Sequence, residues 1–189
     1  LPEIPPLYND MTPKEYLSFV GRAKKIPSAK LSEAVGNVMT KTALHGVADR
    51  LIRNLSKGYR QRVGIAQAIL GDPEIIILDE PTVGLDPMQI IEIRDLIREL
   101  GKDHTVILSS HVLPEISATC DYVIVIAHGK IVASDTMENL NRSFSETEVI
   151  KLEARAPLAD VKEIVSTVRG IENVSFTETP SSVKCDVEV

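Results

Sequence analysis

The chain has 189 residues, of which 43% are hydrophobic and 25% charged, and its formal net charge is −6. The composition is ordinary for a folded domain, and the acidic balance argues against nonspecific nucleic-acid binding, which needs a basic face. Cys120 and Cys185 form no Cys-x-x-Cys pair, so the sequence favours a reducing cytoplasm over a zinc site or disulfide framework. The longest apolar stretches, Ile75–Leu78 and Tyr122–Ala127, are far shorter than the roughly 20 residues that span a membrane. Any role at a membrane is therefore expected from outside the bilayer.

The first third of the chain is predicted to be helical after a proline-rich loop. Thr12, a following proline and Glu15 form a helix start with a threonine N-cap, which predicts a helix over about 13–24. Apolar residues at helical spacing predict a second helix over about 28–44. A third helix, of about fourteen residues, is expected after Leu55.

The middle third changes to the pattern of a layered sheet. Residues 74–79 form a continuous apolar run, which predicts a strand buried on both faces of a parallel sheet. Helices are expected over 87–100 and 113–118, and further strands over 105–109, 122–127 and 130–134. Strands that alternate with helices predict an α/β fold with right-handed crossovers.

The tail has a different character. Strands over 148–154, 174–177 and 183–189 and a helix over 157–168 predict a small α+β unit. We therefore expect two domains. The first is 1–144, with a helical subdomain at about 12–70, and the second is an accessory unit at 145–189.

Two adjacent acids carry the strongest chemical signal. Asp79 and Glu80 end a buried strand, where open α/β sheets place their ligands. Because consecutive strand residues point to opposite sides, one acid can hold Mg²⁺ through water while the other polarises an attacking water. A strand that ends in a solvated acidic turn is the alternative.

Three further sequence features are weak signals of a site individually but are informative in their order along the chain. Ser56 and Gly58 open a helix whose N-terminus can attract phosphate, although ordinary capping explains the serine equally well. Asp86 precedes Pro87 as an N-cap in Gly84-Leu85-Asp86-Pro87, which is also sufficient as a helix start. His111 follows the strand at 105–109, and it would lie near the acids if the two strands are neighbours; otherwise it is a loop residue.

The order and spacing of these features resemble the ABC ATPase family over about residues 1–140. Leu55–Tyr59 (LSKGY) resembles the family signature, and Ile75–Glu80 (IIILDE) resembles the Walker B strand. Gly84–Pro87 resembles the D-loop, His111 the switch histidine, and Glu3 the Q-loop position that usually holds glutamine. The implied fold is α/β, a partial P-loop NTPase-like parallel sheet layered with helices, with a helical subdomain and a small C-terminal α+β unit.

The resemblance also implies roles, cofactors and partners. Asp79 would hold Mg²⁺, Glu80 would be the catalytic base, and His111 would contact the terminal phosphate of ATP. Residues 56–59, namely Ser56, Lys57, Gly58 and Tyr59, would contact ATP held mainly by a second cassette, and Asp86 would join the two sites. The complete protein would be an ATPase on the inner face of the cell membrane that drives a membrane-spanning transporter subunit. Tyr59, where glutamine is commonest, points to the exporter branch.

The sequence departs from the family in one large respect. No G-x-x-x-x-G-K-[ST] loop (Walker A) occurs in the 189 residues, although that loop supplies the phosphate cradle, the lysine and the Mg²⁺-binding hydroxyl. In the family the loop lies upstream of the segment seen here, so we expect that the first part of a longer protein is missing and that this piece alone is inactive. An ABC-type ATPase of a chromosome or ribosome system, and a non-catalytic partner cassette, remain alternatives.

Overall fold

The structure, a computed structural model, describes residues 1–145, 149–168, 173–178 and 182–188. Contacts separate the chain into two units, Leu1–Cys120 and Asp121–Val189. The domain boundary expected from the sequence, after residue 144, follows the order of the motifs. The contacts divide the chain earlier because the strands beyond Cys120 pair with each other and not with the strands before it.

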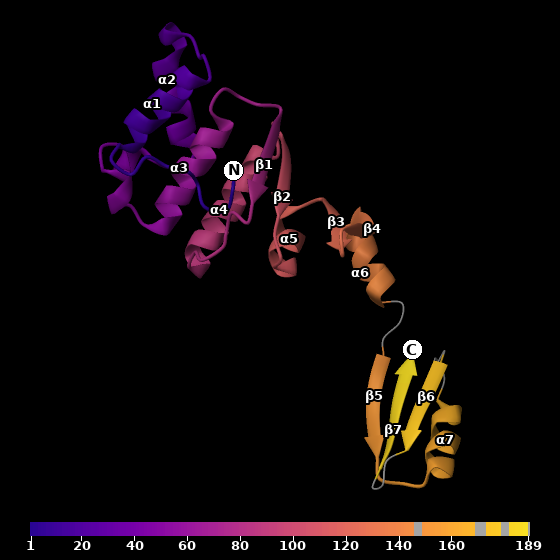
Figure 1. Ribbon diagram of the computed structural model, residues 1–189. Coiled ribbons are helices and arrows are strands. Elements are labelled where there is room, and N and C mark those ends of the chain that lie inside the picture. Colours follow the sequence, from indigo (N-terminus) through magenta and orange to yellow (C-terminus); the bar gives the residue numbers. More distant parts are fainter. Residues whose placement is uncertain (146–148, 169–172, 179–181, 189) are drawn as a thin grey trace. The chain divides into compact units, whose positions relative to one another are not determined.

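The first unit begins with three helices that pack together (Figure 1): α1 (Pro13–Ala23), α2 (Ser28–Lys41) and α3 (Lys57–Ile69). Short 3₁₀ turns, η1 (His45–Val47) and η2 (Ile52–Asn54), join α2 to α3. The expected capping box is present at α1: the Thr12 hydroxyl accepts from the Glu15 N–H, and the Glu15 carboxylate accepts from the Thr12 N–H. The helix start predicted from Thr12, a proline and Glu15 is therefore confirmed.

The second half of this unit contains the predicted parallel strands. β1 (Ile75–Asp79) and β2 (Thr105–Ser109) pair in parallel, and α4 (Pro87–Leu100) connects them. The register runs from Ile75 opposite Thr105 to Asp79 opposite Ser109. A short helix, α5 (Leu113–Thr119), follows β2. The two strands therefore end at the same edge, with the acids beside the segment that leads to His111.

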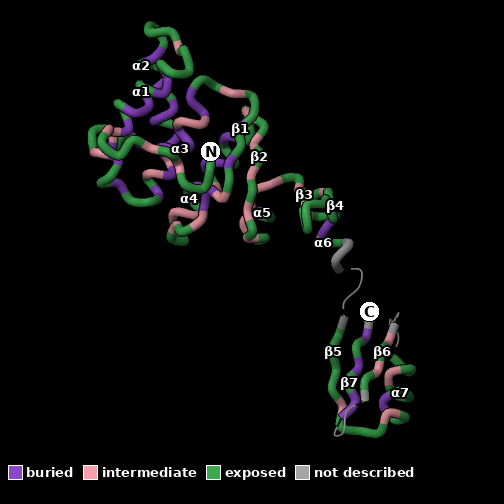
Figure 2. The backbone as a smooth tube through the Cα atoms, in the orientation of Figure 1, coloured by how far each residue is buried: buried purple, intermediate pink, exposed green. Residues whose placement is uncertain are grey.

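The strand β1 is buried on one face rather than on both. Ile76 and Leu78 belong to the same core as the buried residues of α1, α2, α3 and α4. Ile75 and Ile77 point the other way and are 57% and 59% exposed, as the alternating colours along β1 show (Figure 2). The expectation of two-sided burial is wrong for the first unit, because within Leu1–Cys120 one face of β1 belongs to the core and the other is exposed.

The second unit contains two antiparallel arrangements. β3 (Tyr122–Ala127) and β4 (Lys130–Thr136) form a hairpin through His128 and Gly129, both at positive φ. The strand expected as a third member of the parallel sheet thus pairs locally, because a two-residue turn brings its successor directly alongside it. α6 (Met137–Ser145) follows the hairpin and was not expected from the sequence.

The tail is the small α+β unit expected from the sequence. β5 (Val149–Ala154), β6 (Asn173–Glu178) and β7 (Val183–Glu188) form an antiparallel sheet in the order β5-β7-β6. α7 (Leu158–Thr167) connects β5 to β6. Alternate residues of the central strand are buried, namely Val183, Cys185 and Val187.

Among the described residues, no helix has both the length and the apolar character needed to cross a bilayer.

Candidate functional site

The site is built at the carboxyl edge of β1 and β2. The Ser109 hydroxyl donates to Oδ1 of Asp79 over 2.6 Å, and the Glu80 N–H donates to the Ser109 carbonyl over 3.1 Å. Because the parallel register sets Asp79 opposite Ser109, the last residue of β2 fixes the direction of the last carboxylate of β1. The Asp79 side chain is thereby held on the exposed end of the sheet.

Glu80 leaves the strand in an unusual backbone conformation. Its φ is 45°, in the left-handed region that residues other than glycine rarely adopt. Oε1 of Glu80 lies 2.7 Å from Nδ1 of His111, and Oε2 is buried without a hydrogen-bond partner among the described residues. Glu80 therefore presents one oxygen to a histidine and keeps the other available as an acceptor.

His111 is the exposed member of this pair, with 73% of its side chain accessible against 21% for Glu80. The hydrogen bond to Glu80 raises the pKa of His111, and the charges of Glu80, Glu115 and Glu3 raise it further. Nδ1 of His111 and the Glu80 carboxylate therefore form a hydrogen-bonded pair beside the strand-end acid Asp79.

The opening residues of the chain lie beside the same edge. The backbone nitrogen of Leu1 donates to the Ile77 carbonyl over 2.6 Å, and the Asp79 N–H donates to the Leu1 carbonyl over 2.9 Å. Glu3 follows two residues later and is close enough for its charge to act on His111. The structure thus brings together Glu3, Asp79, Glu80 and His111, all predicted as site residues.

A second group forms around the start of α3. Ser56 caps the helix, its hydroxyl accepting from the Tyr59 N–H over 3.3 Å. Gly58 is buried against α4, and a Cβ there would lie 2.6 Å from Cδ of Gln89. Tyr59 stays partly exposed on the first turn. A larger residue at this position would require the end of the Gln89 side chain to move.

The turn after β1 meets the same group. A Cβ on Gly84 would overlap the ammonium group of Lys57, and the φ of Gly84 is 69°. Asp86 caps α4 by accepting from the Gln89 N–H over 2.9 Å. Lys57 and Asp86, predicted from separate motifs, therefore belong to one surface where α3 and α4 begin.

Sequence reasoning missed three participants. Ser109 was visible only as the end of a strand, and its role appears once the register aligns it with Asp79. Gln89 occupies the third position of a capped helix, and its approach to Gly58 depends on how α4 packs. Glu115 accepts a hydrogen bond from Thr82, and no motif of the sequence predicts that pair.

The edge fits a magnesium ion bound together with a phosphate ligand. Within the described ranges, no three His, Cys, Asp or Glu side chains gather into a metal cluster. Mg²⁺ commonly takes one or two carboxylates and completes its shell with waters and phosphate oxygens. Asp79, whose exposed carboxylate is fixed by the Ser109 hydroxyl, meets that requirement without a full protein cage.

Comparison with known proteins identifies a family for the chain. The family model described as ABC transporter matches residues 2–83. Over 158 residues the chain is 36% identical to the uncharacterized ABC transporter ATP-binding protein YxlF of Bacillus subtilis, covering 84% of this chain and 53% of that protein. It is 35% identical to the ABC transporter ATP-binding protein NatA of Bacillus subtilis, covering 72% of this chain and 56% of NatA. For the bacitracin transport ATP-binding protein BcrA of Bacillus licheniformis the identity is 37%, covering 78% of this chain and 49% of BcrA.

The mixed α/β fold together with this match is that of the P-loop NTPase class. The chain carries part of an ATP-binding cassette of the ABC transporter family. It spans about half the length of the curated relatives it matches.

Proposed function

We propose that the complete protein is the ATP-hydrolysing subunit of an ABC transporter, at the cytoplasmic face of the membrane. The observation that carries this proposal is the Glu80–His111 pair beside Asp79 at the carboxyl edge of two parallel strands. The family match and the transport names of the relatives support it. The tyrosine at position 59 favours the exporter branch.

In this proposal the three side chains divide the chemistry of hydrolysis. Asp79 would hold Mg²⁺ through water, and the ion would neutralise charge on the phosphates of ATP. Glu80 accepts a proton from the attacking water, for which its buried and unpaired Oε2 is suited. The water oxygen bonds to the terminal phosphorus as the bond to the bridging oxygen breaks. His111, held against Glu80 by its hydrogen bond, would contact the terminal phosphate as charge develops there.

The surface around Ser56 is proposed to act on a second nucleotide. Ser56, Lys57, Gly58 and Tyr59 would contact ATP held mainly by a second cassette, identical or different, and Asp86 would link the two sites. The free N–H groups at the start of α3 and the positive charge of Lys57 support an anionic ligand there.

The membrane-spanning partner is proposed to dock on the loop before α1. We take Pro5, Pro6, Leu7 and Tyr8 of that loop as the candidate contacts. Tyr8 is 51% exposed and Phe19 is 43% exposed, and their ring centroids lie 5.4 Å apart. An exposed aromatic pair of this kind is typical of protein contacts.

Two variants test this docking surface. Tyr8→Ala combined with Phe19→Ala in the full-length protein should reduce co-purification of the membrane subunit at least about tenfold, as loss of aromatic contact residues does. Ile164→Ala is the matched control, because Ile164 is an exposed apolar residue of α7. Equal recovery with both variants would remove this surface from the proposal.

The 189-residue chain alone is proposed to be inactive. No G-x-x-x-x-G-K-[ST] sequence lies within it, so the backbone cradle and lysine for the phosphates would have to come from another segment. A calorimetric titration of this chain with ATP and Mg²⁺ should show no micromolar binding. Micromolar affinity would contradict the expectation.

The decisive experiment on function is Glu80→Gln in the full-length protein. Loss of the general base should lower ATP turnover by about a hundredfold or more while ATP stays bound. Glu99→Gln makes the same chemical change on the exposed side of α4, where Glu99 pairs with Lys102, and it should leave turnover unchanged. Turnover of Glu80→Gln at the wild-type rate would overturn the proposal.

A further inference from the structure

Three side-chain contacts connect the end of β1 and the turn that follows it to the end of β2 and the segment that follows it. Ser109 bonds to Asp79 and His111 bonds to Glu80 at the open edge of the sheet. The third contact joins Thr82 to Glu115, with the Thr82 hydroxyl donating to Oε2 of the glutamate. Only this third contact lies away from the open edge, since Thr82 is buried. The same two segments are thus tied at the site and again behind it.

The contact between Thr82 and Glu115 lies where it can fix the position of His111. Glu115 lies in the first turn of α5, four residues after the histidine, and its N–H bonds to the carbonyl of Val112. Within α5, Ile116 is the only buried residue. The helix also packs against α4, and the bond to Thr82 links it to the turn after β1.

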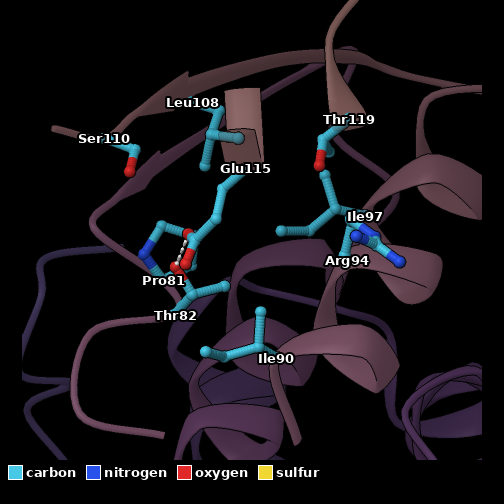
Figure 3. Close-up of a pocket in the computed structure, with 9 residues that line it drawn as sticks. All are labelled: Pro81, Thr82, Ile90, Arg94, Ile97, Leu108, Ser110, Glu115 and Thr119. Atoms are coloured by element: carbon cyan, nitrogen blue, oxygen red, sulfur yellow. Dashed lines mark hydrogen bonds between the residues drawn. The ribbon is translucent and has the colours of Figure 1, made fainter. Parts of the chain in front are cut away.

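The surroundings strengthen that bond. Thr82 and Glu115 line a small cavity of about 10 Å³ between the turn, α4 and α5, whose other walls include Pro81 and Leu108 (Figure 3). Arg94 of α4 lines the same cavity, and its Nε is buried without a hydrogen-bond partner among the described residues. A hydrogen bond to a charged group in a largely apolar, water-poor space is stronger than one in solvent.

We propose that Glu115 is a positioning residue that holds His111 against Glu80 through its hydrogen bond to Thr82. The inference rests on the proposed function, because it assigns the pair a part in ATP hydrolysis. Glu115 does not reach the reacting atoms; it acts by fixing the start of α5 and the histidine that precedes it.

The test compares variants of the full-length protein by steady-state ATPase kinetics. Thr82→Val removes the donor without changing the side-chain shape, and Glu115→Leu removes the acceptor. Each should lower kcat by about ten- to a hundredfold, the range for losing a hydrogen bond to a charged group, with KM for ATP changed by less than about twofold. Thr82→Ser keeps the hydroxyl and should retain most of the rate. Glu99→Gln is again the control for loss of an exposed carboxylate.

The double variant and a second measurement separate positioning from general damage. Thr82→Val with Glu115→Leu should be no slower than either single variant, because both break one bond. Amide hydrogen exchange of peptides covering 109–119 should be faster in Thr82→Val and in Glu115→Leu, and normal in Thr82→Ser. Additive losses, or exchange at the wild-type rate in Thr82→Val, would overturn the proposal.

The experiments distinguish failure of the positioning role of Glu115 from failure of the proposed ATPase function. A normal kcat for Thr82→Val beside an inactive Glu80→Gln overturns the positioning role and leaves the proposed function standing. A normal rate for Glu80→Gln overturns the proposed function. The exchange experiment needs no turnover, so it decides in either case whether the Thr82–Glu115 bond holds the His111 segment.

Discussion

The helical region of α1, α2 and α3 and the strand pair β1–β2 belong to one unit but differ in how completely they are enclosed. In the helical region, residues such as Leu17 and Ile65 are fully buried. In the strand pair, Ile75, Ile77 and Ile107 are more than half exposed. The helices and one face of the strand pair share a single core, whereas the other face of the strand pair is exposed.

The difference follows from where each element finds its hydrogen bonds and its apolar neighbours. A helix satisfies its backbone internally and needs only one apolar stripe covered. A parallel strand needs partners alongside it and layers on both faces. The strand pair is thus the region whose properties depend most on what surrounds it, and the proposed chemistry sits at its edge.

The largest expected effect comes from the enclosed region. Leu17→Ala should lower the free energy of unfolding by about 2–5 kcal/mol, because it leaves a cavity where a fully buried side chain packs. Urea denaturation followed by circular dichroism measures it. A loss below about 1 kcal/mol would mean that the helical core collapses around the gap, and the contrast with the strands would weaken.

A smaller effect is expected at the start of α1. Thr12→Ala removes the side chain that accepts from the Glu15 N–H, and it should cost about 1 kcal/mol. Thr12→Ser keeps the acceptor and should cost much less. Equal losses in the same denaturation experiment would show that the methyl group matters more than the cap.

An aspartate substitution on the exposed face of β1 tests most directly whether the strand pair is less enclosed than the helices. If that face is as open as the 59% exposure of Ile77 indicates, Ile77→Asp should change the stability of the 189-residue chain by less than about 0.5 kcal/mol. Ile76→Asp, on the buried face, should prevent folding. A large loss for Ile77→Asp in the full-length protein alone would show that another segment covers the face there.

The smallest expected change is a titration. Because the hydrogen bond to Glu80 raises the pKa of His111, the stabilisation from this pair is fully present below the ordinary histidine pKa of about 6.5. It is lost as the pH rises through the raised value. In NMR titrations the His111 ring should titrate at higher pH in the wild type than in Glu80→Gln. Identical midpoints would contradict the pairing.

Local patterns predicted the elements well. The cap at Thr12, the Asp86-Pro87 start of α4 and the apolar run of β1 gave bounds within a few residues of the structure. These features are short-range, because caps and periodicity are set by neighbours in the chain. α6 was missed, although Thr136 accepts a hydrogen bond from the Asn139 N–H at its start.

Pairing and side-chain contacts could not be read in the same way. The alternation of strands and helices was compatible with β3 as a third parallel strand. In the structure the short turn at His128 pairs β3 with β4 in an antiparallel hairpin. Ser109 and Glu115 carry no motif of their own and became visible through register and packing. The predicted site residues were found by family spacing, and what holds them in place had to come from the structure.

The backbone of Glu80 bears on what this position tolerates. At a φ of 45°, a side chain with a Cβ is strained by about 1–2 kcal/mol, and asparagine is more at ease there than glutamate. If only the stability of the fold mattered, asparagine or glycine would be the favoured residue after this strand. Glutamate is therefore unfavourable for the backbone at this position. Glu80→Asn should raise the free energy of unfolding and abolish the proposed ATP hydrolysis.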